Sequence, residues 1–510
     1  MKKIILSLFL ASFSFCYGQN VTITPTGITP ASPGALPKLS YTAIKALPSP
    51  QVGDMAIDLT FNCLRFYNGS SWVFFMTSAD YNQPALTAWR AGGSERDAAE
   101  SVAVDASSNV YITGSFYGTA TFGATNITSS GQSDIFVAKY SSSGVLAWVQ
   151  KAGGTLTDNS FSVNVDGSGN IYIAGYYQGT ATFGATNFNS AGSSDIFLAK
   201  YSSTGALTWI QTAGGTGSEY AASLAVDASG NAYITGAFSG TSTFGPTSIS
   251  SVGIGYDTFV AKYNSSGGLT WVQKGGGNQQ DVSSSVAVDA SGNVYICGYF
   301  TGTASFGVIS VTSVGYIDAY LAKYSSSGVI TWVKVGGGTG HDLSQSLCLD
   351  ASSNIYMTGS FNGIATFDAT NLVATSTNSD IFVAKYSSSG VLNWIQKVGG
   401  TSSKTSNSII VNSNGDAFVC GYFTGTSVFG TTSMVSEGGS DVFVAKYNSL
   451  GDLKWALRAG GTSTDEAESI AVTNTGDIFL TGNYLSNSKF GNTILSGTSL
   501  FDVFIARIVE

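Results

Sequence analysis

The feature that most constrains the fold is a unit of about 61 residues that recurs along the chain. A tryptophan marks each copy, and successive tryptophans are 59, 61, 62, 61, 62 and 61 residues apart. They are Trp89, Trp148, Trp209, Trp271, Trp332, Trp394 and Trp455. An aspartate that opens the segment DIFVAKY or its variants recurs with the same period, at Asp134, Asp195, Asp257, Asp318, Asp380, Asp441 and Asp502. So regular a repeat indicates an array of similar units that pack against their neighbours.

Each unit contains four segments in which apolar residues alternate. In the first complete copy they are Ser101–Asp105, Asn109–Phe116, Asp134–Tyr140 and Val145–Gly154. Short turns separate the first from the second and the third from the fourth, and a longer connection, YGTATFGATNITSSGQS, joins the second to the third. Period-two alternation predicts strands, and no unit shows the 3.6-residue period of a helix. We therefore expect an all-β chain.

Seven copies of four antiparallel strands predict a seven-bladed β-propeller with four-stranded blades. A parallel β-helix is the competing repeat fold, but its coils are usually shorter and lack two hairpin turns apiece. The array starts with a lone tryptophan strand, Ala85–Gly93, and ends at Asp502–Glu510, which lacks such a strand. We expect the N-terminal strand to pair with the C-terminal blade, which closes the ring and covers two sheet edges.

Three segments precede the repeats at 85–510. Residues 1–18 have two lysines before a short apolar run, as a secretory signal does. Residues 19–50 hold six of the eight prolines and predict an extended tether. Residues 51–84 contain alternating apolar residues around Asn68–Gly69, which predicts a small β-hairpin module with Trp72 on its packed face, followed by a linker. This module resembles short segments that precede repeat regions in surface proteins of Bacteroidetes.

Charge and composition exclude some functions. The formal charge is −9 and the chain has five arginines, so we expect neither nucleic acid nor an anionic membrane surface as a partner. After the signal, no run of 18 apolar residues follows, so we expect no membrane span. The sequence predicts a secreted or extracytoplasmic, monomeric propeller and leaves a position at the cell surface open. Cys63, Cys297, Cys348 and Cys420 fit small buried apolar positions better than a disulfide framework.

The repeat motif resembles a known family. Its pattern, GG-x(3)-D-x(3)-SVAVD-x-SGNVYITG-x-F…TFG…G-x-x-DIFVAKY-x-x-x-G…W, is similar to the seven-bladed β-propeller repeats of bacterial secreted and surface proteins. The resemblance covers roughly 425 of the 510 residues. It implies a propeller fold and an extracytoplasmic setting, and it brings no agreed activity and no catalytic residues.

The most suggestive polar set is acidic. Four residues after the second glycine of each GG pair stand Asp97, Asp158, Glu219, Asp281, Asp342, Lys404 and Asp465. In a propeller this loop joins one blade to the next, so six carboxylates are candidates for a ligand-binding ring at the channel mouth. Such a ring favours a polyhydroxylated ligand or a cation such as calcium, and no other cofactor or metal is expected. The alternative is that each acid caps backbone N–H groups of its own loop. Lys404 interrupts the ring and is expected to pair with a neighbouring carboxylate.

Residues that differ between copies are the second candidate surface. Tyr176, Tyr299 and Tyr422 follow the glycine of the second strand, and Tyr220 and His341 lie in connecting loops. Tyrosines beside amides and carboxylates suit a glycan or a protein loop.

Enzyme templates fit poorly. His341 is the single histidine and no nucleophile elbow accompanies it, so no catalytic residue is assigned. No His and Cys cluster suits zinc. The preferred function is a secreted or cell-surface, non-enzymatic scaffold that binds an unidentified protein or glycan through its loop-rich face. The alternative is a polysaccharide-active hydrolase or lyase that uses carboxylates near the channel mouth.

Overall fold

The structure is a computed structural model in which the chain divides into two compact units, Met1–Gln83 and Pro84–Glu510. It describes residues 84–498 and 500–510. Nearer the N-terminus it describes residues 20–24, 27–31, 38–39, 43–44, 46, 55–58, 63–67 and 70–74. The expected signal at 1–18 and the Asn68–Gly69 turn lie outside the described residues.

The N-terminal unit contains two small sheets. Its strands are β1 (Asn20–Thr24), β2 (Gly27–Ala31), β3 (Lys38–Leu39), β4 (Met55–Asp58), β5 (Cys63–Tyr67) and β6 (Trp72–Phe74). β1 and β2 form an antiparallel pair inside the segment expected to be an extended tether. β4, β5 and β6 form an antiparallel sheet, and β3 joins it parallel to β4. The predicted hairpin corresponds to β5 and β6.

The second unit consists of strands β7 to β46. The first strands of the copies, called inner strands below, are β8 (Asp97–Val104), β12 (Asn159–Val165), β18 (Glu219–Val226), β24 (Asp281–Val288), β30 (Leu343–Leu349), β36 (Lys404–Val411) and β42 (Asp465–Val472). The second strands are β9 (Val110–Phe122), β13 (Ile171–Tyr177), β19 (Ala232–Phe238), β25 (Val294–Phe300), β31 (Ile355–Phe361), β37 (Ala417–Phe423) and β43 (Ile478–Tyr484). The third are β10 (Thr125–Tyr140), β16 (Asp195–Tyr201), β22 (Asp257–Tyr263), β28 (Asp318–Tyr324), β34 (Asp380–Tyr386), β40 (Asp441–Tyr447) and β46 (Asp502–Val509).

Two further kinds of strand complete the unit. The tryptophan strands are β7 (Ala85–Gly93), β11 (Leu146–Gly154), β17 (Leu207–Gly215), β23 (Leu269–Gly277), β29 (Ile330–Gly338), β35 (Leu392–Gly400) and β41 (Leu453–Gly461). Short outer hairpins are formed by β14 (Thr180–Phe183) with β15 (Thr186–Asn189), β20 (Thr241–Phe244) with β21 (Thr247–Ser250), β26 (Thr303–Phe306) with β27 (Ile309–Thr312), β32 (Ile364–Phe367) with β33 (Thr370–Val373), β38 (Thr426–Phe429) with β39 (Thr432–Val435), and β44 (Asn487–Phe490) with β45 (Thr493–Ser496).

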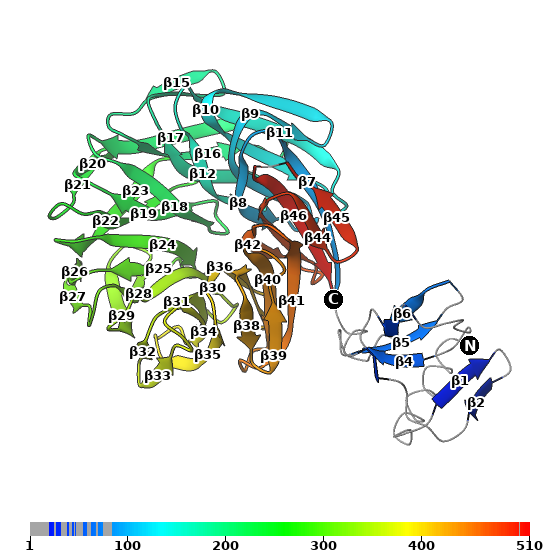
Figure 1. The fold of residues 1–510 in the computed structure, drawn as a ribbon. Helices are drawn as coiled ribbons and strands as arrows, with labels where there is room; N and C mark the ends of the chain where they lie inside the picture. Colours follow the sequence, from blue (N-terminus) through cyan, green and yellow to red (C-terminus); the bar gives the residue numbers. More distant parts are fainter. Residues whose placement is uncertain are drawn as a thin grey trace. The chain divides into compact units, whose positions relative to one another are not determined.

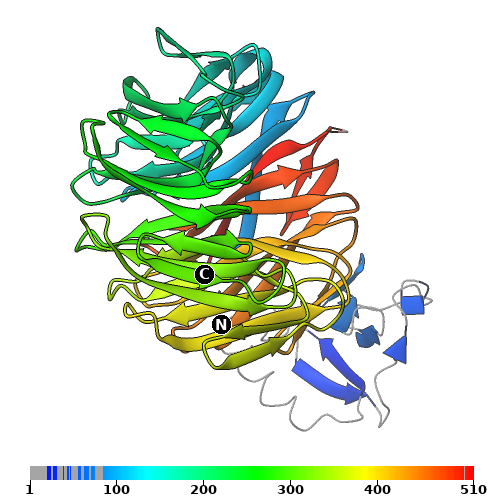
Figure 2. The ribbon, with the colours of Figure 1, turned by 90° about the vertical axis from the view of Figure 1, so that its left-hand side faces the viewer.

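These strands form a propeller-like all-β fold, but the expected seven four-stranded blades are wrong. Hydrogen bonding defines six sheets in Pro84–Glu510, one of ten strands and five of six. A typical six-stranded sheet has the order β12-β13-β16-β17-β20-β21. Figure 1 shows the sheets fanned around a common centre, and the side view in Figure 2 shows them following one another in sequence order.

The extra strands come from the connection that was expected to be a loop. In the third copy this connection turns at Gly245, which has a φ of 52°, and its two halves pair from Phe244↔Thr247 to Thr241↔Ser250. The hairpin then adds to the preceding tryptophan strand through Gly215↔Ser242. In the first copy β9 and β10 run through this region without a break, and the sheet they belong to grows to ten strands.

The two ends of the unit meet in the ten-stranded sheet. β7 pairs antiparallel with β46, from Val503↔Ala91 to Val509↔Ala85, and with β9 at Gly92↔Thr121. Figure 1 shows β7 beside β46. This is the pairing that the sequence predicts, and it covers the edges of the first and last strands.

The core lies between neighbouring sheets and consists of the residues that recur with the period of the repeat. Phe122 packs on Phe136 with ring centroids 4.8 Å apart, and Phe244 on Phe259 at 5.0 Å. The tryptophans reach the following copy: Trp148 Nε1 donates to the carbonyl oxygen of Ser203 at 3.3 Å. Repeated aromatic residues therefore join neighbouring units.

Candidate functional site

The six acids that were candidates for a ring stand at the start of the inner strands or one residue before it. They are Asp97, Asp158, Glu219, Asp281, Asp342 and Asp465, and each has an exposed fraction of 0%. The equivalent residue of the remaining copy, Lys404, is buried as well. None of these side chains lies at the protein surface.

Each acid accepts a hydrogen bond from the backbone N–H of the glycine four residues before it. The donor–acceptor distances are 2.6 Å for Gly93 and Asp97, 3.2 Å for Gly215 and Glu219, and 2.7 Å for the pairs of Asp158, Asp281, Asp342 and Asp465. The second oxygen of Asp158 accepts the backbone N–H of Gln178 at 3.0 Å, and Asp281 and Asp342 have equivalent bonds. The carboxylates thus cap their own loops, which is the second of the two roles that the sequence left open.

Burial changes the acidity of these groups. It is the largest cause that raises the pKa of Asp97, Asp158 and Glu219 to about 7, and a second nearby carboxylate raises each further. The same causes raise the pKa of Asp281 and Asp342 to about 7 and that of Asp465 to about 6. Backbone or side-chain hydrogen bonds oppose the shift in every case. A buried carboxyl group is therefore poorly stabilised in its charged form here.

Lys404 makes the ion pair that the sequence predicts. Its Nζ lies 2.8 Å from Asp380 Oδ1, and both side chains have an exposed fraction of 0%. Nζ also donates to the carbonyl oxygen of Ser379 at 3.1 Å. The lysine is thus an integral part of the packing between two copies.

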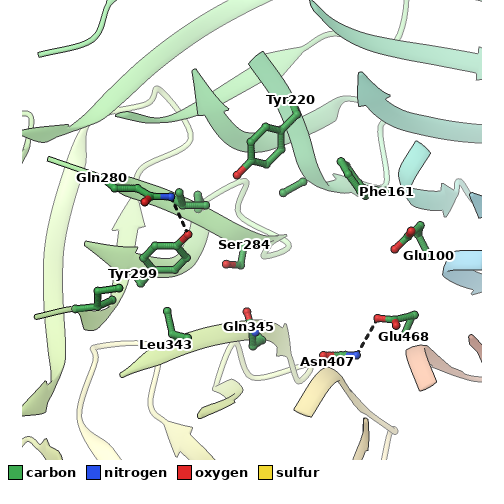
Figure 3. A pocket seen from close by; sticks show the side chains of 14 residues that line it. Glu100, Phe161, Tyr220, Gln280, Ser284, Tyr299, Leu343, Gln345, Asn407 and Glu468 are labelled. Atoms are coloured by element: carbon green, nitrogen blue, oxygen red, sulfur yellow. Dashed lines mark hydrogen bonds between the residues drawn. The ribbon is translucent and has the colours of Figure 1, made fainter. Parts of the chain in front are cut away.

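A pocket of about 620 Å³ opens where the inner strands meet. The residue at one equivalent position of each of the seven inner strands lines it: Glu100, Phe161, Ala222, Ser284, Gln345, Asn407 and Glu468. Each stands three residues after the acid or lysine that caps the loop. Figure 3 shows these side chains directed toward one central space, which makes the pocket the candidate binding site.

A β-bulge places these lining residues. The pairing register of every inner strand shifts by one residue at this position, for example between Ala99 and Ser101 around Glu100, and between Ala467 and Ser469 around Glu468. The other five inner strands shift in the same way. A bulged residue leaves the regular alternation of a strand, so its side chain is re-aimed, here toward the centre. Sequence reasoning missed this position, although its variation from copy to copy was a usable signal.

Aromatic and amide groups form one side of the pocket. Phe161 and Tyr220 have ring centroids 6.1 Å apart, and Gln280 Nε2 donates to the Tyr299 hydroxyl at 3.3 Å. Of the five residues predicted for the variable face, Tyr220 and Tyr299 line the pocket. Tyr176 packs against Phe161 with ring centroids 5.7 Å apart.

The other two predicted residues lie elsewhere. His341 is exposed and stacks on Tyr316, with ring centroids 5.3 Å apart and an interplanar angle of 19°. Tyr422 is partly buried on β37, opposite Thr405, and does not line the pocket. The structure therefore brings three of the five residues together.

Two glutamates from neighbouring inner strands lie on the same side of the pocket (Figure 3). Asn407 Nδ2 donates to Glu468 Oε2 at 2.8 Å. Burial, together with the charges of Glu100 and Glu466, raises the pKa of Glu468 to about 8. Burial also raises the pKa of Glu100, while hydrogen bonding by Asn159 and the charge of Arg96 lower it. A positively charged group that enters the pocket would relieve this repulsion.

Other chemistries have little support among the described residues. No group of three or more His, Cys, Asp or Glu side chains there is arranged as a metal site. Cys297, Cys348 and Cys420 are free and buried, which is the environment expected for them. Within the same described ranges, no helix has both the length and the apolar character needed to cross a membrane.

Comparison with known proteins gives distant matches. No family model matches the chain. The chain is 25% identical over 478 residues to an uncharacterized WD repeat-containing protein, L264, of Acanthamoeba polyphaga mimivirus, a match that covers 76% of this chain and 34% of that protein. It is 27% identical over 186 residues to the regulatory protein FlaEY of Caulobacter vibrioides, which covers 34% of this chain and 20% of FlaEY. The chain thus spans about a third or less of the curated relatives that it matches.

Among solved structures, the WD40 β-propeller domain of Doa1 resembles 82% of this chain and 97% of its own, with 12% sequence identity and a TM-score of 0.42. A member of the DUF4221 family from Bacteroides vulgatus covers 84% of this chain at 10% identity and a TM-score of 0.32. Likeness at this level assigns no function. The repeats and the sheets of the chain itself give the description of a propeller-like, all-β fold.

Proposed function

We propose that the protein is a non-enzymatic scaffold that binds another protein, and that the pocket receives a basic side chain of the partner. The observation that carries this proposal is the pair of partly buried glutamates, Glu100 and Glu468, in the same pocket as the aromatic rings of Phe161 and Tyr220. A lysine or arginine head group neutralises the carboxylates, and its apolar stem and charge both suit aromatic faces. The amides of Gln280 and Gln345 offer additional hydrogen bonds.

An apolar surface beside the pocket favours a protein over a glycan. Ile254, Val314 and Tyr316 are exposed by 102%, 72% and 70%, on the loops that lead into β22 and β28. The same loops contribute to the pocket, because Ile317 lines it and Tyr256 lies 6.1 Å from Tyr220 between ring centroids. An apolar patch next to a polar pocket is typical of a protein-binding surface.

The alternative of a hydrolase or lyase has no comparable support. The ring acids that it would use are buried and accept backbone hydrogen bonds. We therefore propose only the scaffold function. An extracytoplasmic setting is part of the proposal: its support is the signal-like pattern of residues 1–18 and the resemblance of the motif to bacterial secreted and surface repeats.

The experiment is binding to an array of short peptides that contain a central arginine, lysine, citrulline or glutamine among apolar residues. We expect the protein to prefer the charged peptides, and Glu100→Gln with Glu468→Gln to weaken their binding at least tenfold. Asp452→Asn is the matched control, because this acid is exposed and lies in a turn away from the pocket. Equal binding of arginine and citrulline peptides, or preferential binding to a glycan array, would contradict the proposal.

A further inference from the structure

Each buried loop acid faces a second buried carboxylate from the neighbouring copy. The pairs are Asp502 with Asp97, Asp134 with Asp158, Asp195 with Glu219, Asp257 with Asp281, Asp318 with Asp342, and Asp441 with Asp465. The first member of each pair is the aspartate that opens the third strand, and its exposed fraction is 0%, or 6% for Asp195. The repeat thus builds six carboxylate pairs inside the protein.

One oxygen of each strand aspartate has no partner. The Oδ2 atom of the strand aspartate accepts a backbone N–H, for example from Ser130 to Asp134 at 2.9 Å and from Val314 to Asp318 at 3.0 Å. The Oδ1 atom has no hydrogen-bond partner in Asp134, Asp195, Asp257, Asp318, Asp441 and Asp502. A buried carboxylate oxygen without a partner lowers the stability of the fold. Its repetition in six copies therefore indicates a position at which a positive group binds.

A glycine backbone lies against both carboxylates in several of the pairs. A Cβ atom on Gly153 would lie 2.7 Å from Asp134 Oδ1 and 2.9 Å from Asp158 Oδ2. The corresponding distances are 2.6 and 3.0 Å at Gly276, and 2.7 and 2.9 Å at Gly460. In these copies, oxygens of both carboxylates therefore lie close to each other on the same side of the glycine backbone, where a side chain at the glycine would clash with them.

The copy that contains Lys404 shows what satisfies this oxygen. Lys404 replaces the loop acid, and its Nζ lies 2.8 Å from Asp380 Oδ1. Asp380 Oδ1 is the atom that lacks a partner in the other six copies. Exchange of an acid for lysine changes the formal charge of the pair from −2 to 0, and a divalent cation bound to two carboxylates has the same effect.

We propose that each of the six carboxylate pairs binds a calcium ion, and that the Lys404 ammonium takes the place of this ion in the one copy without an acid pair. Carboxylate oxygens are the ligands that Ca²⁺ prefers, and its flexible coordination allows water and backbone carbonyls to complete the six to eight oxygens that it takes. Zinc is disfavoured because no histidine or cysteine belongs to these pairs. The ions would tie the third strand of one copy to the inner strand of the next.

Basic side chains distinguish the six sites. Lys151 Nζ lies 3.5 Å from Asp134 Oδ2, Lys274 Nζ 4.0 Å from Asp257 Oδ2, and Arg458 Nη1 2.5 Å from Asp441 Oδ2. Among the described residues, no ion pair reaches Asp195, Asp318 or Asp502, but the charge of Arg90 acts on Asp502. We therefore expect the pairs of Asp195 and Asp318 to bind calcium most tightly, because no competing positive charge is present.

The experiment measures bound metal and thermal unfolding of the full chain. After equilibration with Ca²⁺ and removal of free ions, elemental analysis should find calcium at up to six ions per chain, and chelation should lower the melting temperature. Lys404→Asp creates a seventh acid pair and should add one ion, whereas Asp342→Lys copies the natural lysine and should remove one. Lys397→Asp is the control, because Lys397 is only partly buried and lies 3.8 Å from Asp380 on its other oxygen.

Two outcomes would overturn the proposal. Less than one calcium ion per chain, with a melting temperature that chelation leaves unchanged, would mean that the pairs bind no metal. A melting temperature that falls as the pH rises from 5 to 8, and that calcium does not restore, would mean that a proton neutralises each pair. If Lys404→Asp fails to fold, the ion count of the Asp342→Lys protein decides alone: the proposal requires one ion fewer than in the natural chain, and an unchanged count refutes it.

Discussion

Two positions three residues apart on the same inner strand behave in opposite ways. The first position holds an acid in six copies and lysine in one, and all seven side chains are buried. The second position holds glutamate, aromatic, small or amide residues, and all seven side chains line one pocket. The strand bulges at the second position, so that the first side chain stays in the packing between copies and the second turns to the centre.

The difference teaches how a repeat separates stability from binding. The first position recurs because each copy needs the same loop cap and the same contact with its neighbour. The second position is free to vary because a bulged residue is not part of that contact. In a repeat protein, the position that differs between copies is therefore the better guide to the binding site.

The largest effect should come from the one lysine at the first position. Lys404→Met leaves Asp380 buried without its partner, and removal of one member of a buried ion pair destabilises a protein by about 3–5 kcal/mol. Lys397→Met is the control, since a partly exposed lysine at 3.8 Å contributes no more than about 1 kcal/mol. Urea unfolding followed by tryptophan fluorescence measures both. Equal stability of the two variants would show that the buried pair is not the important contact.

A smaller effect should separate the two positions within one copy. Asp281→Ala leaves the N–H groups of Gly277 and Thr301 without an acceptor, which lowers the free energy of unfolding by about 1–3 kcal/mol. Ser284→Ala removes a lining hydroxyl and should change it by less than about 0.5 kcal/mol. The comparison fails if Ser284→Ala is the more destabilising change.

The second position should make binding depend on pH. The pKa of Glu468 is about 8 in the free protein, and a basic ligand lowers it, so that binding releases a proton. Affinity for an arginine peptide should then rise by up to about tenfold per pH unit below pH 8 and level off above it. Titration calorimetry at pH 6, 7, 8 and 9 measures this. Glu468→Gln should flatten the profile, and a steep profile in that variant would assign the proton to another group.

The smallest effect should come from the apolar patch outside the pocket. Tyr316→Ser removes an exposed ring that contacts His341, and it should weaken peptide binding by less than about 1 kcal/mol. Its melting temperature should not change. Val145→Ser, at another exposed position, serves as the control for nonspecific loss of apolar surface.

Part of the fold is predictable from the sequence because it rests on local periodicity. The alternating segments predict the inner, second, third and tryptophan strands, and the lone strand Ala85–Gly93 predicts the pairing of β7 with β46. The outer hairpins were missed because each strand has four residues, too few for a clear period. Thr241 and Thr243 are exposed, and Phe244 is buried only because β20 pairs with the preceding tryptophan strand.

The candidate site was predictable to a smaller extent. Tyr220 and Tyr299 could be chosen because they vary between copies. Glu100 and Glu468 were missed although their position also varies between copies, because regular alternation would place a bulged residue on a different face. The ring acids were identified as a set, but whether they face a ligand or a backbone N–H depends on the loop geometry.

The sequence by itself determined that the chain is a closed array of β-strand units, because hydrophobic alternation and turn residues are local properties that recur at a fixed distance. It also determined which residues recur in every copy. The tertiary structure alone decided how many strands join each sheet, which acids are buried in pairs, and which side chains meet at the centre. These depend on hydrogen bonds and packing between segments about 24 residues or more apart in the chain, and no local pattern records such contacts.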